Sequence, residues 1–198
     1  MDGSSSWIGL EIAKLIVSAL TPLTVALIGI GFARAAKRLE ASQWVNQKLI
    51  EKRIELMDDA LPQLNDLYCY FIWIGNWKEL SPPDVIQRKR SLDRLFYANR
   101  PFFSTELITA YEEFSASLFK TYAAPGADAL LRTSLVSQDG DRRTSYPKTW
   151  TAEWAATFTE IGDHTNRGTI REWYDRLMDR ASLEVGADSK HGHVRAVP

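Results

Sequence analysis

The longest uninterrupted apolar stretch of the chain lies near its amino terminus. Residues Leu15–Ala33 include no charged side chain, and their only hydroxyls are those of Ser18, Thr21 and Thr24. Nineteen residues of helix, at about 1.5 Å each, span about 28 Å, close to the ~30 Å hydrocarbon core of a bilayer. The pattern therefore predicts a transmembrane helix over residues 7–33 that follows a short tail, residues 1–6. Pro22 lacks an N–H group and should kink this helix, which membrane helices tolerate.

The charges that flank this stretch predict its orientation. Basic side chains follow it closely, beginning with Arg34, Lys37 and Arg38, whereas only Lys14 and the amino terminus precede it. The positive-inside rule then places the tail outside and residues 34–198 in the cytoplasm. A cleaved signal peptide is the alternative, but its start should be basic and its apolar core shorter. A single cysteine, Cys69, fits a reducing compartment.

A second apolar pattern follows the membrane stretch. Residues 34–61 contain no Gly or Pro and predict a basic helical stalk. From Ile50 the apolar side chains recur in steps of four and three, as expected of a helix that packs along its length; they are Ile50, Ile54, Met57, Leu61, Leu64, Tyr68 and Phe71. Two uses remain open, the core of one subunit or a seam between identical subunits. Pro62 should bend or restart the helix.

The remaining pattern predicts a compact helical domain over residues 62–185. Leu64–Trp77 is typical of a buried helix that ends at Gly75, with a strand over residues 68–74 as the weaker alternative. Ser81 and Ser104 are N-cap residues for helices over residues 82–99 and 105–122. The periodicity fails over residues 123–148, which predicts a long loop of the kind that often binds a partner.

Helical periodicity returns in the last third of the chain. Trp154, Phe158 and Ile161 are expected on one helix face, and a further helix should extend from Ile170 to about Val185. Residues 186–198 read as a disordered tail. The fold class is therefore all-α: one transmembrane helix that continues into a stalk, then a cytoplasmic domain of five or six helices.

Composition and motifs argue against several functions. Residues 34–198 hold 23 basic and 23 acidic side chains, because one of the 24 basic and two of the 25 acidic residues precede them; this balance argues against bulk nucleic-acid binding. The chain has no phosphate-binding glycine motif, no nucleophile elbow and no zinc-ligand spacing. His164 beside Asp163 resembles a base with its orienting carboxylate, but an exposed turn is the simpler interpretation. His191 and His193 are expected to be solvated. We therefore expect a non-enzyme without cofactor or metal.

Two groups of residues are candidates for function. The first shares one face of the membrane helix and would line a water-filled path if several copies turned it inward; it comprises Glu11, Lys14, Ser18, Thr21, Val25 and Ile28. The simpler interpretation is that Glu11 and Lys14 pair at the outer interface. The second group could receive an anionic ligand such as a nucleotide or oligonucleotide; it comprises Arg132, Arg142, Arg143 and Lys148. The alternative for this group is ordinary surface charge.

The layout resembles a known class of protein. One N-terminal membrane helix, a basic stalk and a small helical domain, with LNDLYCYFIWIGNWKEL and RLFYANRPFFSTE as the most distinctive segments, resemble the small membrane effectors of bacterial antiphage defence. The Hailong-type membrane channel proteins are the nearest in layout, and the membrane accessory proteins of type VI CRISPR systems are the second. The resemblance implies a homo-oligomeric pore in the bacterial inner membrane that is toxic when open and is controlled by a nucleotide or oligonucleotide made by a partner enzyme. A membrane-tethered interaction module without a pore is the alternative.

Overall fold

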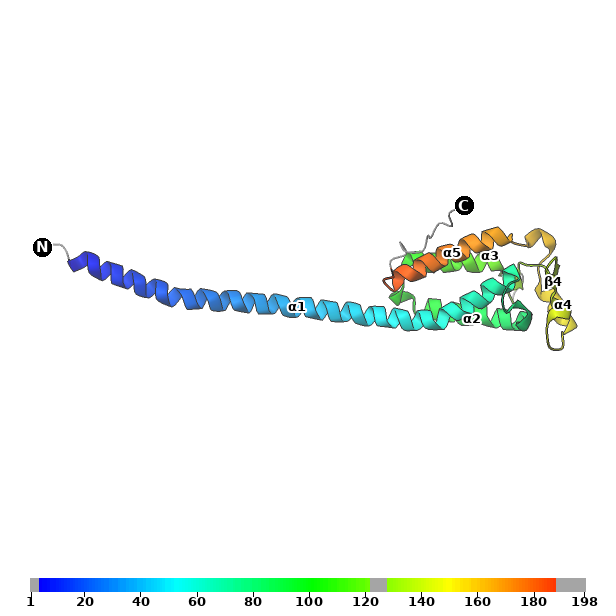
Figure 1. The fold of residues 1–198 in the computed structure, drawn as a ribbon, viewed down its shortest axis with the longest axis horizontal. Coiled ribbons are helices and arrows are strands. Elements are labelled where there is room, and N and C mark those ends of the chain that lie inside the picture. The colour runs from blue at the N-terminus through cyan, green and yellow to red at the C-terminus, as the bar shows by residue number, and fades with distance from the viewer. Residues whose placement is uncertain (1–3, 122–127, 188–198) are drawn as a thin grey trace, which may run out of the picture. The chain divides into compact units, whose positions relative to one another are not determined.

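The computed structural model describes residues 4–121 and 128–187, although the side chains of many residues between 4 and 45 lie outside the described set (Figure 1). The described residues are mostly helical, as the sequence predicts, with five α-helices, four short 3₁₀ helices and four two-residue strands. The chain divides into two compact units, Met1–Lys48 and Leu49–Pro198. The second unit starts before Pro62, the expected boundary, because Leu56, Met57 and Ala60 already belong to its core.

Helix α1 covers residues Ser4–Ile72 without a break. The expected restart at Pro62 is wrong. A proline removes the N–H that would bond the carbonyl four residues earlier, here that of Asp58. The Gln63 side chain bonds the next carbonyl, since its Nε2 donates to the Asp59 carbonyl at 2.9 Å. Pro62 is also exposed, so water can reach the backbone on that side. The side chain of Pro22 lies outside the described residues, so the kink expected there is not tested.

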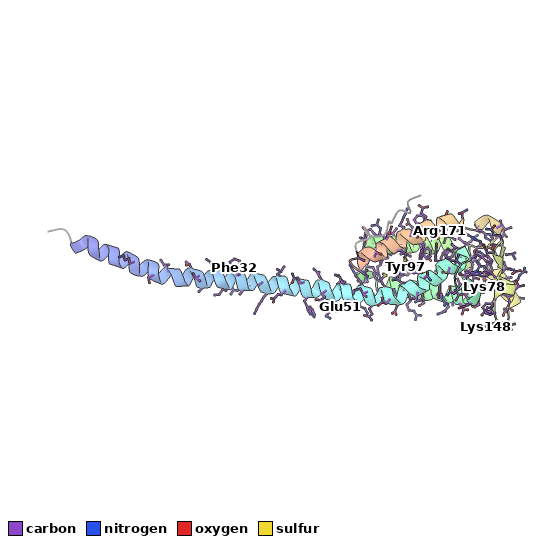
Figure 2. All side chains as sticks on the ribbon, viewed as in Figure 1. Phe32, Glu51, Lys78, Tyr97, Lys148 and Arg171 are labelled. Atoms are coloured by element: carbon purple, nitrogen blue, oxygen red, sulfur yellow. The ribbon has the colours of Figure 1, made fainter. Side chains whose placement is uncertain are left out.

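The first unit exposes large apolar side chains. Phe32 is 74% exposed, Val25 63% and Ile28 59%, and Figure 2 labels Phe32 on the surface of α1. Within the part of the chain that the structure describes, no helix combines the length and the apolar character needed to cross a membrane.

The second unit has one continuous hydrophobic core. The end of α1 buries a stripe of side chains that includes Leu56, Met57, Ala60, Leu64, Leu67 and Phe71. Helix α3, Thr105–Leu118, packs extensively against α5, Arg167–Glu184. Of the repeating apolar positions predicted from Ile50 onward, Met57, Leu64 and Phe71 are buried, whereas Ile50, Ile54 and Leu61 are 37–42% exposed. The repeat therefore serves the subunit core in part and leaves an apolar edge in part.

Both expected N-caps are present. Helix α2, Pro82–Ala98, begins with a capping box, in which the Asp84 N–H donates to the Ser81 hydroxyl and the Ser81 N–H donates to the Asp84 carboxylate. The Ser104 hydroxyl accepts from the Leu107 N–H at the start of α3. Near this cap, the buried Glu184 carboxylate accepts from the Ser104 N–H at 2.8 Å and pairs with Arg53 of α1 at 3.0 Å. This ion pair joins α1, α3 and α5.

The expected loop over residues 123–148 includes regular structure, although residues 122–127 lie outside the described set. Strand β1, Phe119–Lys120, pairs with β2, Leu130–Leu131, and β3, Val136–Ser137, pairs with β4, Gly140–Asp141, both antiparallel. Helix α4, Arg142–Ser145, follows directly.

The expected helix around Trp154 is not formed. Residues Ala152–Thr157 and Ile161–Asp163 form the 3₁₀ helices η3 and η4. Phe158 between them is extended and bridges to Leu131. Ile161 is 86% exposed, so it does not share a buried face with Phe158. Pairing with β2 thus replaces the helical periodicity that the sequence indicates. Residues 188–198, most of the expected disordered tail, lie outside the described residues.

Candidate functional site

Three aromatic side chains, in the last turn of α1 and just beyond it, form a cage. Tyr70, Trp73 and Trp77 are each at most 5% exposed, and Trp77 belongs to the 3₁₀ helix η1, Trp77–Glu79. The Trp73 and Trp77 rings lie 4.7 Å apart between centroids. Helix α1 ends at Ile72, three residues before the expected Gly75, because Trp73 adopts a left-handed backbone with φ of 66°. Such a value is a genuine outlier for a bulky residue.

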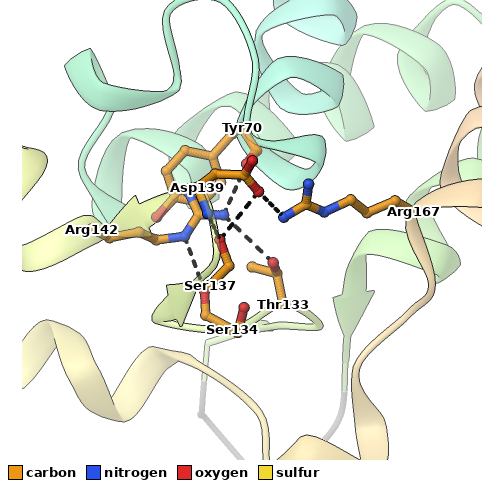
Figure 3. A network of polar contacts seen from close by, with 7 residues as sticks. All are labelled: Tyr70, Thr133, Ser134, Ser137, Asp139, Arg142 and Arg167. Atoms are coloured by element: carbon orange, nitrogen blue, oxygen red, sulfur yellow. Dashed lines mark hydrogen bonds and ion pairs between the residues drawn. The ribbon is translucent and has the colours of Figure 1, made fainter.

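A buried arginine fills the cage. Arg142, the first residue of α4, is 2% exposed, and its guanidinium carbon lies 3.9 Å from the Tyr70 ring centroid and 3.8 Å from that of Trp73. Its Nη2 donates to the Tyr70 carbonyl at 2.9 Å and its Nε to the Ser134 carbonyl at 3.1 Å (Figure 3). Because α4 lies 70 residues beyond α1 in the sequence, only the fold brings these groups together.

The charge of Arg142 lacks a counter-ion among the residues that the structure describes. Its donors face backbone carbonyls, the Thr133 hydroxyl and aromatic rings, and its Nη1 is buried without a hydrogen-bond partner there. Burial lowers the pKa of Arg142 to about 10, so the side chain remains protonated at neutral pH. Burial also raises the pKa of Tyr70 to about 12, although the Arg142 cation opposes this shift. The site is therefore a desolvated cation held by dipoles and π faces.

The hairpin before Arg142 aims it into the cage. Gly140 in β4 has φ of 144°, a backbone conformation that favours glycine, and a Cβ there would lie 3.3 Å from the Ser145 hydroxyl. Asp141 caps α4 by accepting from the Arg143 N–H. Asp139 binds Arg167 of α5 and accepts from the Ser137 hydroxyl (Figure 3). The hairpin thus connects the end of α1 with the start of α5.

The four cations expected to receive an anionic ligand occupy different environments. The prediction that Arg142 is available to a ligand is wrong for this structure, because the aromatic cage encloses its side chain in the core. Arg143 is exposed and pairs with Asp141 at 2.6 Å. Arg132 is half-buried and donates to the Ala116 carbonyl, while Lys148 is exposed. Ligand binding by Arg132, Arg143 and Lys148 stays a prediction.

The candidate pore-lining residues are described only in part. Lys14, Ser18, Val25 and Ile28 are exposed on α1, whereas the side chains of Glu11 and Thr21 lie outside the described residues. A role of these residues in a pore stays a prediction.

The candidate catalytic pair is not assembled as a pair. Lys120 forms an ion pair with Asp163 at 2.5 Å and lowers the pKa of that carboxyl group. His164 Nε2 lies 3.1 Å from the Thr159 carbonyl oxygen. Each side chain of the pair thus has a partner elsewhere. Over residues 4–121 and 128–187, no three potential metal ligands gather at one point. His191 and His193 lie beyond these ranges.

A second aromatic group lies after α4. Tyr146, Trp150 and Trp154 are half-buried and meet edge to face, with ring centroids 5.3–6.3 Å apart. The Trp150 Nε1 is buried without a hydrogen-bond partner among the described residues.

The sequence analysis missed both aromatic groups, although signals for the first were present. Tyr70, Trp73 and Trp77 follow in steps of three and four, and Asp139-Gly140 is a strong hairpin signal just before Arg142. No comparable signal marks the second group. Comparison with known proteins adds no assignment: no family model, curated protein or solved structure matches the chain.

Proposed function

We propose that the chain is the subunit of a homo-oligomeric membrane pore. In this proposal residues 15–33 span the bacterial inner membrane, and residues 49–198 form a cytoplasmic domain that controls opening. By resemblance, the open pore is toxic and serves antiphage defence, with a nucleotide or oligonucleotide as the controlling ligand.

The observation that carries the proposal is the apolar character of the first unit. Val25, Ile28 and Phe32 are more than half exposed in an unbroken helix, and residues 15–33 carry no charge. Transfer of each such side chain from water to an apolar environment is favourable by about 1.5–3 kcal/mol of free energy. The interior of a bilayer is such an environment. The side chains of residues 15–17, 19, 21–23 and 27 lie outside the described set, so the length of the apolar stretch is taken from the sequence.

Self-assembly follows from the geometry of a single-pass protein. One helix cannot enclose a water-filled path, so a pore requires several copies that turn a polar face inward. Ser18 and the predicted neighbour Thr21 supply hydroxyls on such a face, and Lys14 supplies a charge near its outer end. The exposed edge of Ile50, Ile54 and Leu61 offers a further apolar surface for self-association.

Planar-bilayer recording of the purified full chain tests the proposal. We expect discrete currents from the wild type and their loss in the double variant Ser18→Leu with Thr21→Leu, because leucine blocks hydration of the predicted path. Ala19→Leu with Ala26→Leu is the matched control, since it also introduces two leucines but on the opposite side of the helix by helical spacing, and its currents should persist. Absence of current from wild-type protein that retains its oligomeric size would contradict the pore.

A membrane-tethered interaction module is the second candidate. The half-buried group of Tyr146, Trp150 and Trp154 favours it, because aromatic side chains dominate the binding energy of protein interfaces. Replacing residues 15–33 by a plain Leu/Ala segment separates the two candidates. A module would keep its toxicity after the exchange, whereas the proposed pore would lose it.

A further inference from the structure

We propose that Arg142 is a latch that exchanges between the aromatic cage and solvent, and thereby couples the hairpin of residues 136–141 to the last turns of α1. The latch itself is a property of the second unit. Only its use, as the element through which the domain controls a pore, rests on the proposed function.

The closed latch is held by interactions that oppose the cost of its desolvation. Removing a cation from water costs several kcal/mol, and no described carboxylate repays this cost for Arg142. A desolvated cation–π contact offsets part of this cost, and so does each hydrogen bond to the charged group. Two well-placed rings and two short bonds to carbonyls are present, but Nη1 has no partner among the described residues. Hydration of the released side chain therefore competes with the cage.

The backbone of Trp73 gives the latch a mechanical consequence. A left-handed backbone at a bulky residue is strained and persists only where the surroundings enforce it. The Arg142 guanidinium packs on the ring of this strained residue, Trp73, and bonds the Tyr70 carbonyl in the helical turn before it. When Arg142 leaves, Trp73 can relax, and the last turn of α1 rearranges with it.

The neighbouring residues provide a handle for an anion. Arg143 is exposed and bonded to Asp141, and Asp141 also caps α4. A multiply charged anion that draws Arg143 from Asp141 weakens this cap. The same anion can pair with Arg142 only after its release. It thus binds the open state more tightly than the closed state, which is the condition for shifting the equilibrium.

Hydrogen exchange of the wild-type full chain in detergent, followed by mass spectrometry at increasing urea, tests the latch. We expect amides of residues 70–77 and 133–146 to open together, at a lower free energy than those of α3 and α5, because the latch releases one cooperative unit. Inorganic triphosphate is the probe anion and should speed exchange in these two segments alone. Exchange of both segments only with global unfolding, or no response to triphosphate, would overturn the latch.

A matched pair of variants sharpens the test. Arg142→Gln removes the caged charge and should speed exchange at residues 70–77 about tenfold, which corresponds to about 1.4 kcal/mol. Arg180→Gln removes an exposed charge on α5, outside the hairpin and the cage, and should leave exchange of residues 70–77 within about twofold. Equal exchange in Arg142→Gln and wild type would refute the coupling. If Arg142→Gln fails to fold, the wild-type measurement decides. Neither readout uses current, so a failed pore and a failed latch remain distinguishable.

Discussion

Residues 14–33 and 56–72 of α1 are both helical and both rich in apolar side chains. The described apolar side chains of the first segment are exposed, whereas many of those in the second are buried. Phe32 is 74% exposed, whereas Phe71 is 1% exposed within the core of the second unit. The later segment finds partners because α2, α3 and α5 fold around it, while the earlier one has no described partner element in its own unit. The difference teaches that helix formation alone does not say where apolar surface is buried. Burial of an apolar face depends on the partner that covers it, which is protein for the second segment and, as proposed, lipid for the first.

The strongest way to break this comparison is to charge the first segment. Val25→Lys with Ile28→Lys should abolish membrane association, because each lysine near the centre of a bilayer costs about 2.5–3.5 kcal/mol. Alkaline extraction and flotation of cell membranes measure the outcome, and thermal unfolding of the second unit should stay unchanged. Val25→Leu with Ile28→Leu is the control and should remain in the membrane fraction. If the lysine variant stays in the membrane fraction, the proposal that residues 15–33 span the membrane is refuted.

Two phenylalanines test the same contrast by truncation. Phe114 is fully buried on α3, so Phe114→Ala should lower the free energy of unfolding of the domain by about 3–5 kcal/mol. Phe32→Ala removes the same atoms from an exposed position and should leave that free energy within about 0.5 kcal/mol. Urea titrations followed by tryptophan fluorescence compare the two. Similar losses in both variants would mean that Phe32 also packs in a protein core.

The apolar edge of the second unit lies between these extremes. Ile50 and Ile54 are 39% and 42% exposed, so Ile50→Glu with Ile54→Glu should leave the fold intact. The added charges should weaken self-association about tenfold or more, equivalent to about 1.4 kcal/mol. Native mass in detergent gives the readout. Gln87→Glu with Thr109→Glu adds the same charge at exposed positions elsewhere and should keep the native size. An unchanged oligomer in the isoleucine variant would assign the edge to the subunit alone.

The smallest expected effect concerns the cap of α2. Burial tends to raise the pKa of Asp84, but bonds from Ser81 and the cations of Arg88 and Lys148 outweigh it and lower the pKa below its usual 3.8. A lowered folded-state pKa adds stability that is complete above the unfolded value and is lost as the pH falls through the folded value. Asp84→Asn should therefore cost about 1 kcal/mol at pH 7. This difference should shrink below about pH 4 in denaturation curves measured at several pH values. A difference independent of pH would show that the carboxylate charge plays no part.

The local signals of the sequence predicted much of the helical architecture. Ser81 and Ser104 mark helix starts because each side-chain oxygen accepts a hydrogen bond from a backbone N–H three residues later. Such a contact depends only on the local sequence. Failures came where distant partners outweighed local preference. Phe158 is extended because it bridges to Leu131, 27 residues away. Pro62 lies inside a helix that continues to Ile72, where the side chains on both sides of it, Ala60 and Leu64, are buried in the core of the second unit.

The candidate site divides in the same way. The sequence by itself determined the uncharged stretch of residues 15–33, the capped helices and a cation-bearing segment after residue 130, since each depends on composition or on spacing within a few residues. Only the tertiary structure decided that Arg142 enters a cage of Tyr70, Trp73 and Trp77 while Arg143 stays in solvent. Two adjacent arginines are chemically identical in the sequence. Their environments diverge because the β3–β4 hairpin points one toward the core and the other away, and burial depends on contacts that no local pattern records.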